Sequence, residues 1–171
     1  MSVSFYWNQH SDLRTLNFIP NSATPYLLRN DEAGNAYLVD AWGDRRVLPW
    51  WKPSAGDDLM HKVLRIIPGM HATDEADGDD PGYQFSFRSS MDLPHNVEFD
   101  FGIEVVDRLP DPTVRGYVQA NARIAWHDAP ALKLSLSGNN LPAAYHLETV
   151  EPGIAPLEVQ RSIYLGLRWK Y

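Results

Sequence analysis

Apolar and polar side chains alternate strictly over residues 161–171, the last eleven of the chain. Successive side chains of a β-strand point to opposite faces, so this segment predicts a strand with one apolar and one mostly polar face. Such a strand suits a membrane wall that meets lipid on one side and a wet lumen on the other. A soluble edge strand would seldom end on exposed aromatics. The apolar positions are Ile163, Leu165, Leu167, Trp169 and Tyr171.

The same alternation recurs upstream in segments of about eleven residues, close to the roughly 9 to 11 residues that a tilted strand needs to cross a bilayer. It predicts strands around residues 83–93, 97–105, 117–126 and 132–137. In the second of these, Val, Phe and Ile alternate with Glu, Asp and Gly. No run of eighteen apolar residues occurs, which excludes a membrane-spanning helix.

Two tight turns, residues 93–97 and 127–131, are expected to join these strands into hairpins over 83–107 and 117–141. A three-residue loop in each hairpin keeps both apolar faces on the same side. A slip by one residue would move carboxylates to the apolar face, so the register is well specified. The predicted cross-strand pairs are Leu93 with Val97, Phe87 with Ile103, Trp126 with Leu132, and Ile124 with Leu134.

Long polar connections are expected at residues 10–26, 67–82, 108–116 and 142–160. Short turns on one side and long loops on the other are the arrangement of outer-membrane barrels. The pattern therefore predicts an all-β fold, an antiparallel up-and-down transmembrane barrel segment of about eight strands. It is either a partial wall of a larger barrel, which we favour, or a small closed barrel.

The amino-terminal third is less regular. Val3, Phe5 and Trp7 alternate well, but Arg45, Pro53 and Asp57 then fall on apolar positions. Arg45 lies near a turn, so its charge should destabilise the barrel only slightly, because the free-energy cost of a lipid-facing charge falls toward the membrane interface. Asp57 lacks that explanation, so the sequence predicts a bulge that shifts the register, an exposed edge, or a stretch under weak selection.

Six stretches of the sequence, considered together with their order and spacing, resemble a known protein family. They are residues 6–14, 30–40, 48–56, 79–94, 132–141 and 159–171. Together they resemble the C-terminal part of the barrel of TonB-dependent outer-membrane receptors, over nearly the whole chain. In that family the terminal strand is also the signal that the barrel-assembly machinery reads, which implies this role for Ile163, Leu165, Leu167, Trp169 and Tyr171.

A complete receptor of this kind has about 22 strands and a plugged lumen. The resemblance therefore implies that residues 1–171 are a C-terminal barrel fragment with no plug domain, serving uptake of a scarce ligand such as a ferric siderophore. It implies contact with outer-membrane lipid, with the barrel-assembly machinery and, only through the missing plug, with the TonB complex. The expected location is the outer membrane of a Gram-negative cell, although residues 1–8 lack the features of a signal peptide.

Two other functions fit the pattern less well. One is a self-contained eight-stranded outer-membrane barrel with a structural or adhesion role, since eight strands can close around side chains alone. The other is a soluble lipocalin-like binding protein or β-sandwich enzyme. The outward faces of the last five predicted strands carry no charges, which favours lipid over water.

Composition and motifs exclude several kinds of chemistry. The net charge of −7 and the absence of a basic stripe argue against a nucleic-acid partner. There is no cysteine, no nucleophile elbow, no phosphate loop and no dinucleotide fingerprint, so we expect neither an enzyme nor a cofactor. Glu98 and Asp100 could imitate a glycosidase pair, but on a barrel strand they are lumen residues first.

No metal site is expected either. The acidic residues at 74–80 lack the spacing of a calcium loop, and the histidines show no paired spacing for zinc. The acidic residues therefore indicate a solvated loop. They are Asp74, Glu75, Asp77, Asp79 and Asp80, and the histidines are His10, His61, His71, His95, His127 and His146.

Inward-facing charges and tryptophans complete the picture. The charges could line a ligand path, but cross-strand ion pairs in a hydrated lumen are the simpler interpretation. They are Arg88, Glu98, Asp100, Glu104, Arg123, Lys133, Arg168 and Lys170. Tryptophans near the tight turns and the C-terminus predict one periplasmic interfacial girdle of Trp50, Trp51, Trp126 and Trp169.

Overall fold

The computed structural model describes residues 1–21, 23, 25–69, 78, 80–111, 113–129, 131–150, 156 and 158–170. In this part of the chain the regular elements are all strands, and no helix is long and apolar enough to cross a membrane. The strands are β1 (Ser2–Phe18), β2 (Tyr26–Asp44), β3 (Trp51–Ile66), β4 (Tyr83–Leu93), β5 (Val97–Val106), β6 (Tyr117–Ala129), β7 (Leu132–Asn139), β8 (Tyr145–Leu147), β9 (Glu158–Gln160) and β10 (Ser162–Trp169).

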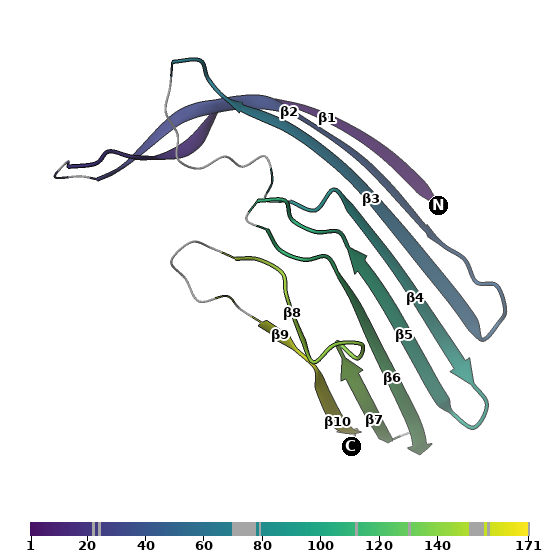
Figure 1. Cartoon of the computed structure of the whole chain (residues 1–171). Helices are drawn as coiled ribbons and strands as arrows, with labels where there is room; N and C mark the ends of the chain where they lie inside the picture. The colour runs from purple at the N-terminus through teal and green to yellow at the C-terminus, as the bar shows by residue number, and fades with distance from the viewer. Residues whose placement is uncertain are drawn as a thin grey trace.

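Eight of the strands form one antiparallel sheet in the order β1-β2-β3-β4-β5-β6-β7-β10. The sheet is curved and open, and the short strands β8 and β9 pair separately near its end (Figure 1). Within the described residues β1 pairs only with β2, and β10 only with β7. The all-β, up-and-down prediction is confirmed, as is the preference for an open segment.

The β4–β5 hairpin has the predicted register. Leu93 lies opposite Val97 and Phe87 opposite Ile103, as a three-residue turn requires. Within the turn His95 and Asn96 have positive φ angles of 63° and 59°. Asn and His tolerate this left-handed region better than most residues, which helps the chain reverse tightly here.

The predicted register of the β6–β7 hairpin is wrong by two residues. Ile124 lies opposite Leu136 rather than Leu134, and Trp126 opposite Leu134 rather than Leu132. The cause is that β6 continues to Ala129 and bulges between His127 and Ala129, so the reversal is tighter than expected. Because side chains repeat every two residues, the shift leaves both apolar faces where the sequence placed them.

The expected long connection at residues 10–26 is also wrong. β1 and β2 continue as a paired hairpin to Phe18 and Tyr26, and in Figure 1 they sweep beyond the neighbouring strands. Bulges between His10 and Thr15, with Asp12 at φ 58°, interrupt the pairing. Each bulge breaks the period of two, which is why the alternation fades there in the sequence.

Asp57 lies on the apolar face without any bulge. It pairs with Ala41 on β2 and with Phe85 on β4, and neither pairing of β3 shifts register. β3 is an inner strand, so the edge explanation is wrong as well. Tyr83 hydrogen-bonds to the Asp57 carboxylate, whose Oδ1 is buried without a partner. Arg45 follows the end of β2, in the turn where its charge was expected to cost little.

The sheet has almost no hydrophobic core. Among the described residues the buried hydrophobic side chains are few, and two of them are alanines: Leu64, Val106, Leu109, Val114, Ala120 and Ala125. Large apolar side chains on the outer face are exposed instead, with Leu165 at 83% and Trp169 at 72%. A soluble sheet normally buries its apolar face against a second layer, and the described part of this chain has no such layer.

Candidate functional site

Polar side chains gather on the face of the sheet opposite the exposed apolar one. The register brings them into rows across the strands, one of which is Lys52, Ser90, Asp100, Arg123, Ser137 and Tyr164. The charged side chains of this face on β5, β6 and β7 are partly buried. Large apolar side chains of the opposite face are more exposed, as Leu165 and Trp169 show. This polar face is the candidate functional surface.

An ion network spans β5, β6 and β7 near the tight turns. Arg123 Nη1 lies 2.7 Å from Asp100 Oδ2, and Arg123 Nη2 lies 3.2 Å from Glu98 Oε2. Glu98 also accepts from Lys133 Nζ at 2.7 Å and contacts His127 Nε2 at 2.7 Å. Each partly exposed ion pair contributes at most about 1 kcal/mol to the stability of the fold. The Glu98 carboxylate is nevertheless shared by cations on β6 and β7, so it links three neighbouring strands. The cross-strand ion pairs expected from the sequence are present at these residues.

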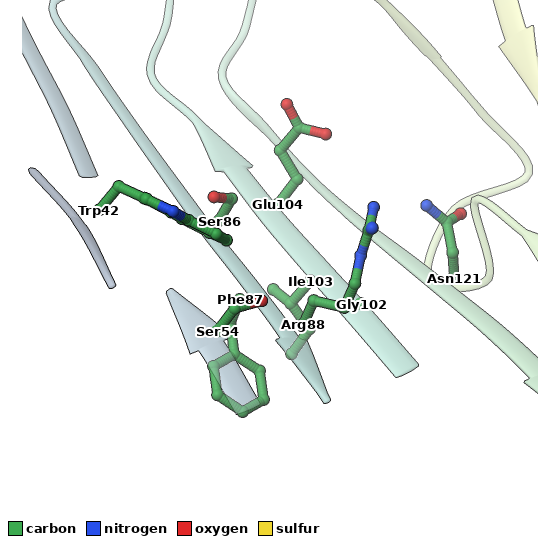
Figure 2. A pocket seen from close by; sticks show the side chains of 9 residues that line it. All are labelled: Trp42, Ser54, Ser86, Phe87, Arg88, Gly102, Ile103, Glu104 and Asn121. Atoms are coloured by element: carbon green, nitrogen blue, oxygen red, sulfur yellow. The ribbon is translucent and has the colours of Figure 1, made fainter. Parts of the chain in front are cut away.

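A shallow hollow lies in the middle of the polar face (Figure 2). Trp42, Arg88, Glu104 and Asn121 come to it from β2, β4, β5 and β6. Phe87 also lines the hollow, and in Figure 2 its ring points away from Glu104. The Arg88 side chain makes no ion pair or hydrogen bond with any described residue. The hollow thus offers an unpaired guanidinium beside an indole and a carboxylate.

Gly56 makes room for the indole of this hollow. It lies directly opposite Trp42, and a Cβ added there would approach Trp42 Cε3 to 3.4 Å and Ser86 Oγ to 3.0 Å. A Cβ here would crowd the Ser86 hydroxyl and would reach the indole at about ordinary contact distance. The glycine therefore lets the indole lie close against β3, a role that the sequence pattern did not indicate.

The β8–β9 pair is fastened to the loop end of the polar face through Asn140. This side chain is fully buried, and its Nδ2 donates to the Val159 carbonyl at 2.8 Å. Its backbone N–H donates to Asn121 Oδ1 at 3.0 Å, and its φ is 50°. His146 of β8 stacks on Tyr117 with ring centroids 4.0 Å apart. The expected connection at 142–160 therefore contains a small hairpin seated on the sheet.

The terminal-strand residues lie where the alternation placed them. Ile163, Leu165, Leu167 and Trp169 follow one another along the exposed apolar face of β10, which pairs with β7 over its whole length. Tyr171 lies outside the described residues. Their role as an assembly signal stays a prediction.

The four tryptophans of the predicted girdle lie toward the tight-turn end of the sheet. Trp50 precedes β3 and Trp51 begins it, with their rings stacked at 6.4 Å. Trp126 and Trp169 lie close to the β6–β7 turn. Trp51 Nε1 donates to Ser89 Oγ at 2.8 Å, so one indole of the group has its donor satisfied. Whether they meet a membrane interface stays a prediction.

Of the acidic residues at 74–80, only Asp80 is described, and it pairs with Lys62 at 2.6 Å. Asp74, Glu75, Asp77, Asp79 and His71 lie outside the described residues. In the described part of the chain no three His, Cys, Asp or Glu side chains converge as metal ligands would.

No protein-family model matches the sequence. No curated protein matches it either. Solved structures do match its fold: FpvAI in complex with pyocin S2 covers 98% of the chain at a TM-score of 0.71 and 14% identity. The fold is therefore that of part of the FpvA structure. P. aeruginosa FpvA bound to heterologous pyoverdines with iron gives a TM-score of 0.67 over 98% of the chain at 13% identity.

FpvA is a TonB-dependent siderophore receptor, so the structural neighbours are of the kind that the sequence resembles. The chain spans only 24% of the length of either neighbour. The likeness therefore concerns one continuous part of a much larger barrel protein.

Proposed function

We propose that residues 1–171 are the C-terminal part of the barrel of a TonB-dependent outer-membrane receptor. The piece supplies wall and loops for the uptake of a scarce ligand such as a ferric siderophore, and it catalyses no reaction. The fold likeness to FpvA over 98% of the chain supports the receptor class.

The observation that carries the proposal is the uncovered apolar face. Exposed Val, Leu, Ile, Phe and Trp side chains run across the sheet from Val3 to Trp169. Soluble monomers rarely expose apolar patches larger than a few hundred Å². In a bilayer the same face is solvated by acyl chains, while the polar face lines a wet lumen. The tight turns, with their tryptophans, then lie at the periplasmic interface.

The open edges favour a fragment over a small closed barrel. β1 and β10 each leave one row of backbone groups unpaired within the described sheet. Unpaired backbone groups in hydrocarbon cost several kcal/mol each, so strands of the remaining wall must cover both edges. Lipid, the barrel-assembly machinery and the rest of the receptor are thus the proposed partners, and the TonB complex acts only through a plug.

Site-directed spin labelling tests the lipid-facing assignment. The chain contains no cysteine, so single cysteines at positions 132–137 each carry one label without background. After refolding into phosphatidylcholine vesicles, labels at 132, 134 and 136 should be accessible to oxygen, and labels at 133, 135 and 137 to a water-soluble nickel complex. Loss of this alternation, or a chain that stays monomeric in water without detergent, would contradict the proposal.

A further inference from the structure

One arginine at the tight-turn end of the sheet belongs to the apolar face. Arg45 follows the last residue of β2, yet its backbone N–H still donates to the Pro53 carbonyl at 3.2 Å. This bond continues the register in which Asp44 lies opposite Ser54. Because side chains alternate along a strand, Arg45 takes the apolar face and its neighbour Arg46 takes the polar face.

The charge of Arg45 is not balanced from within the described chain. Arg45 is exposed, and its side chain makes no ion pair or hydrogen bond with a described residue. Asp44 belongs to the polar face and pairs with Lys52 at 2.9 Å. Where β3 pairs with β2 and β4, Asp57 is the one described carboxylate on the apolar face, and it takes a hydrogen bond from Tyr83. The apolar face around Arg45 therefore carries an uncompensated positive charge.

Arg45 also lies at a level that matches a membrane boundary. Twelve residues along β3 separate its cross-strand partner Pro53 from Arg65, which is exposed on the same face. At about 3.3 Å per residue and a tilt of about 45°, this distance is about 28 Å along the membrane normal, close to the roughly 30 Å of a hydrocarbon core. The two arginines therefore bracket the hydrocarbon, and Arg45 marks its boundary at the tight turns.

Two indoles accompany Arg45 at this boundary. Trp51 is its diagonal neighbour across the hairpin, at a separation that a long side chain can bridge. The Trp51 Nε1 donates to Ser89, which fixes that ring against the sheet. Trp50 stacks on Trp51 and is 43% exposed, and its Nε1 makes no hydrogen bond with a described residue. The group thus offers a guanidinium and an indole N–H that have no acceptor in the described chain.

We propose that Arg45, with Trp50 beside it, binds the phosphate of an anionic phospholipid such as phosphatidylglycerol, in the leaflet at the tight-turn end. This inference rests on the proposed function, which places the apolar face in lipid. A guanidinium can hold two phosphate oxygens through parallel hydrogen bonds. A zwitterionic headgroup fits less well, because Arg45 would repel its ammonium and the only outward carboxylate nearby, Asp57, is already engaged by Tyr83.

Quenching of a fluorescent label beside the site tests the proposal. Val47 is 48% exposed, and the chain contains no cysteine, so Val47→Cys carries a single bimane label. The labelled full chain is refolded into phosphatidylcholine vesicles that contain a small fraction of either 5-doxyl phosphatidylglycerol or 5-doxyl phosphatidylcholine, whose nitroxide quenches bimane on contact. Phosphatidylglycerol should be preferred by about fivefold, the factor by which one arginine near the membrane surface attracts an anionic lipid.

The adjacent arginine provides a matched control. Arg45→Gln should reduce the preference to about onefold, whereas Arg46→Gln removes the same charge from the other face and should leave it within about twofold. Arg45→Lys keeps the charge without the paired donors and should retain part of the preference. Raising the sodium chloride concentration from about 50 to about 500 mM should weaken the preference of the chain with both arginines, which tests the site even if Arg45→Gln does not refold.

Four results would overturn the proposal: equal quenching by the two lipids, a preference that is unchanged in Arg45→Gln, a loss in Arg46→Gln equal to that in Arg45→Gln, or removal of the preference by millimolar inorganic phosphate. The last would assign Arg45 to a free anion. Spin labels at positions 132–137 in the same vesicles keep the two hypotheses apart. Alternating accessibility with equal quenching refutes the lipid site alone, whereas loss of alternation refutes the barrel-wall function and the lipid site with it.

Discussion

The carboxylate of Asp57 faces outward together with Ala41 and Phe85, and a tyrosine hydroxyl is its one described hydrogen-bond donor. A carboxylate on a lipid-facing surface is costly unless it is hydrogen-bonded. At the scale of single residues, Asp57 and Tyr83 are therefore coupled. A substitution of either one should change the stability of the protein through its effect on the Asp57 carboxylate.

Asp57→Leu should raise the free energy of unfolding in lipid vesicles by about 1 to 2 kcal/mol, because an outward acid is replaced by an apolar side chain. Tyr83→Phe should lower it, since Asp57 then loses its donor. Urea titration followed by tryptophan fluorescence measures both. Asp100→Leu is the matched control on the polar face and should be destabilising, because Arg123 loses its partner at 2.7 Å. Destabilisation by Asp57→Leu as large as that by Asp100→Leu would contradict the outward assignment.

Asn140 is the second residue whose local role can be tested. Asn140→Ala removes the hydrogen bond to Val159 and places Ala at a φ of 50°. It should therefore weaken the attachment of the β8–β9 pair to the sheet by about 1 to 3 kcal/mol. Amide exchange should rise at Leu141 and Arg161, whose N–H groups donate to Ala120 and Ala144. Asn140→Gly relieves the backbone strain alone and should recover only part of the loss. Unchanged exchange in Asn140→Ala would show that the hairpin is held by other contacts.

At the scale of elements, strand parity decides how neighbouring residues respond to the same change. Leu134 and Ser135 are adjacent on β7, yet they lie on the apolar and polar faces respectively. Both cross-strand partners of Leu134, Trp126 and Leu167, are apolar, whereas Ser135 lies opposite Ala125 and Gly166. A charge placed at these two positions should therefore have opposite consequences.

Leu134→Arg should impair membrane insertion far more than Ser135→Arg, by about 2 to 4 kcal/mol at the bilayer midplane. Heat-modifiable mobility on gels and refolding yield in lipid vesicles give the comparison directly. Equal yields of the two variants would count against a lipid-facing β7.

At the scale of the whole molecule, the described strands form an open sheet of eight strands and a separate pair. The chain spans 24% of the length of the FpvA proteins whose fold it shares. Its outer edges, β1 and β10, end the described sheet without further partners. Under the proposed function, such a piece would need the rest of the wall before it could line a ligand path.

If the proposed function holds, cells that express residues 1–171 alone should therefore take up no ferric siderophore beyond the background of cells without the gene. Uptake of radiolabelled iron, measured with and without a proton uncoupler, tests this, and a full-length receptor serves as the positive control. Uncoupler-sensitive uptake by the chain alone would refute the fragment proposal.

The sequence by itself determined which side chains share a face. Period-two alternation is local, because neighbouring side chains of a strand must diverge whatever the strand pairs with. It therefore predicted the strands of β4 to β7 and β10, and the β4–β5 register, where a three-residue turn admits one pairing. Turn chemistry and alternation agree there. Alternation also put Asp57 on the apolar face, but the bulge or sheet edge offered to explain that position is not found.

Only the tertiary structure decided features that several pairings satisfy equally well. A slip of two residues between β6 and β7 preserves both faces, so alternation is blind to it. The same holds for the sharing of Glu98 among three cations, the Trp42 hollow opposite Gly56, and the Asn140 seat of β8–β9, which join residues far apart in the chain. Alternation also does not determine whether the edges close, because closure depends on strand number and shear rather than on the face that any side chain takes.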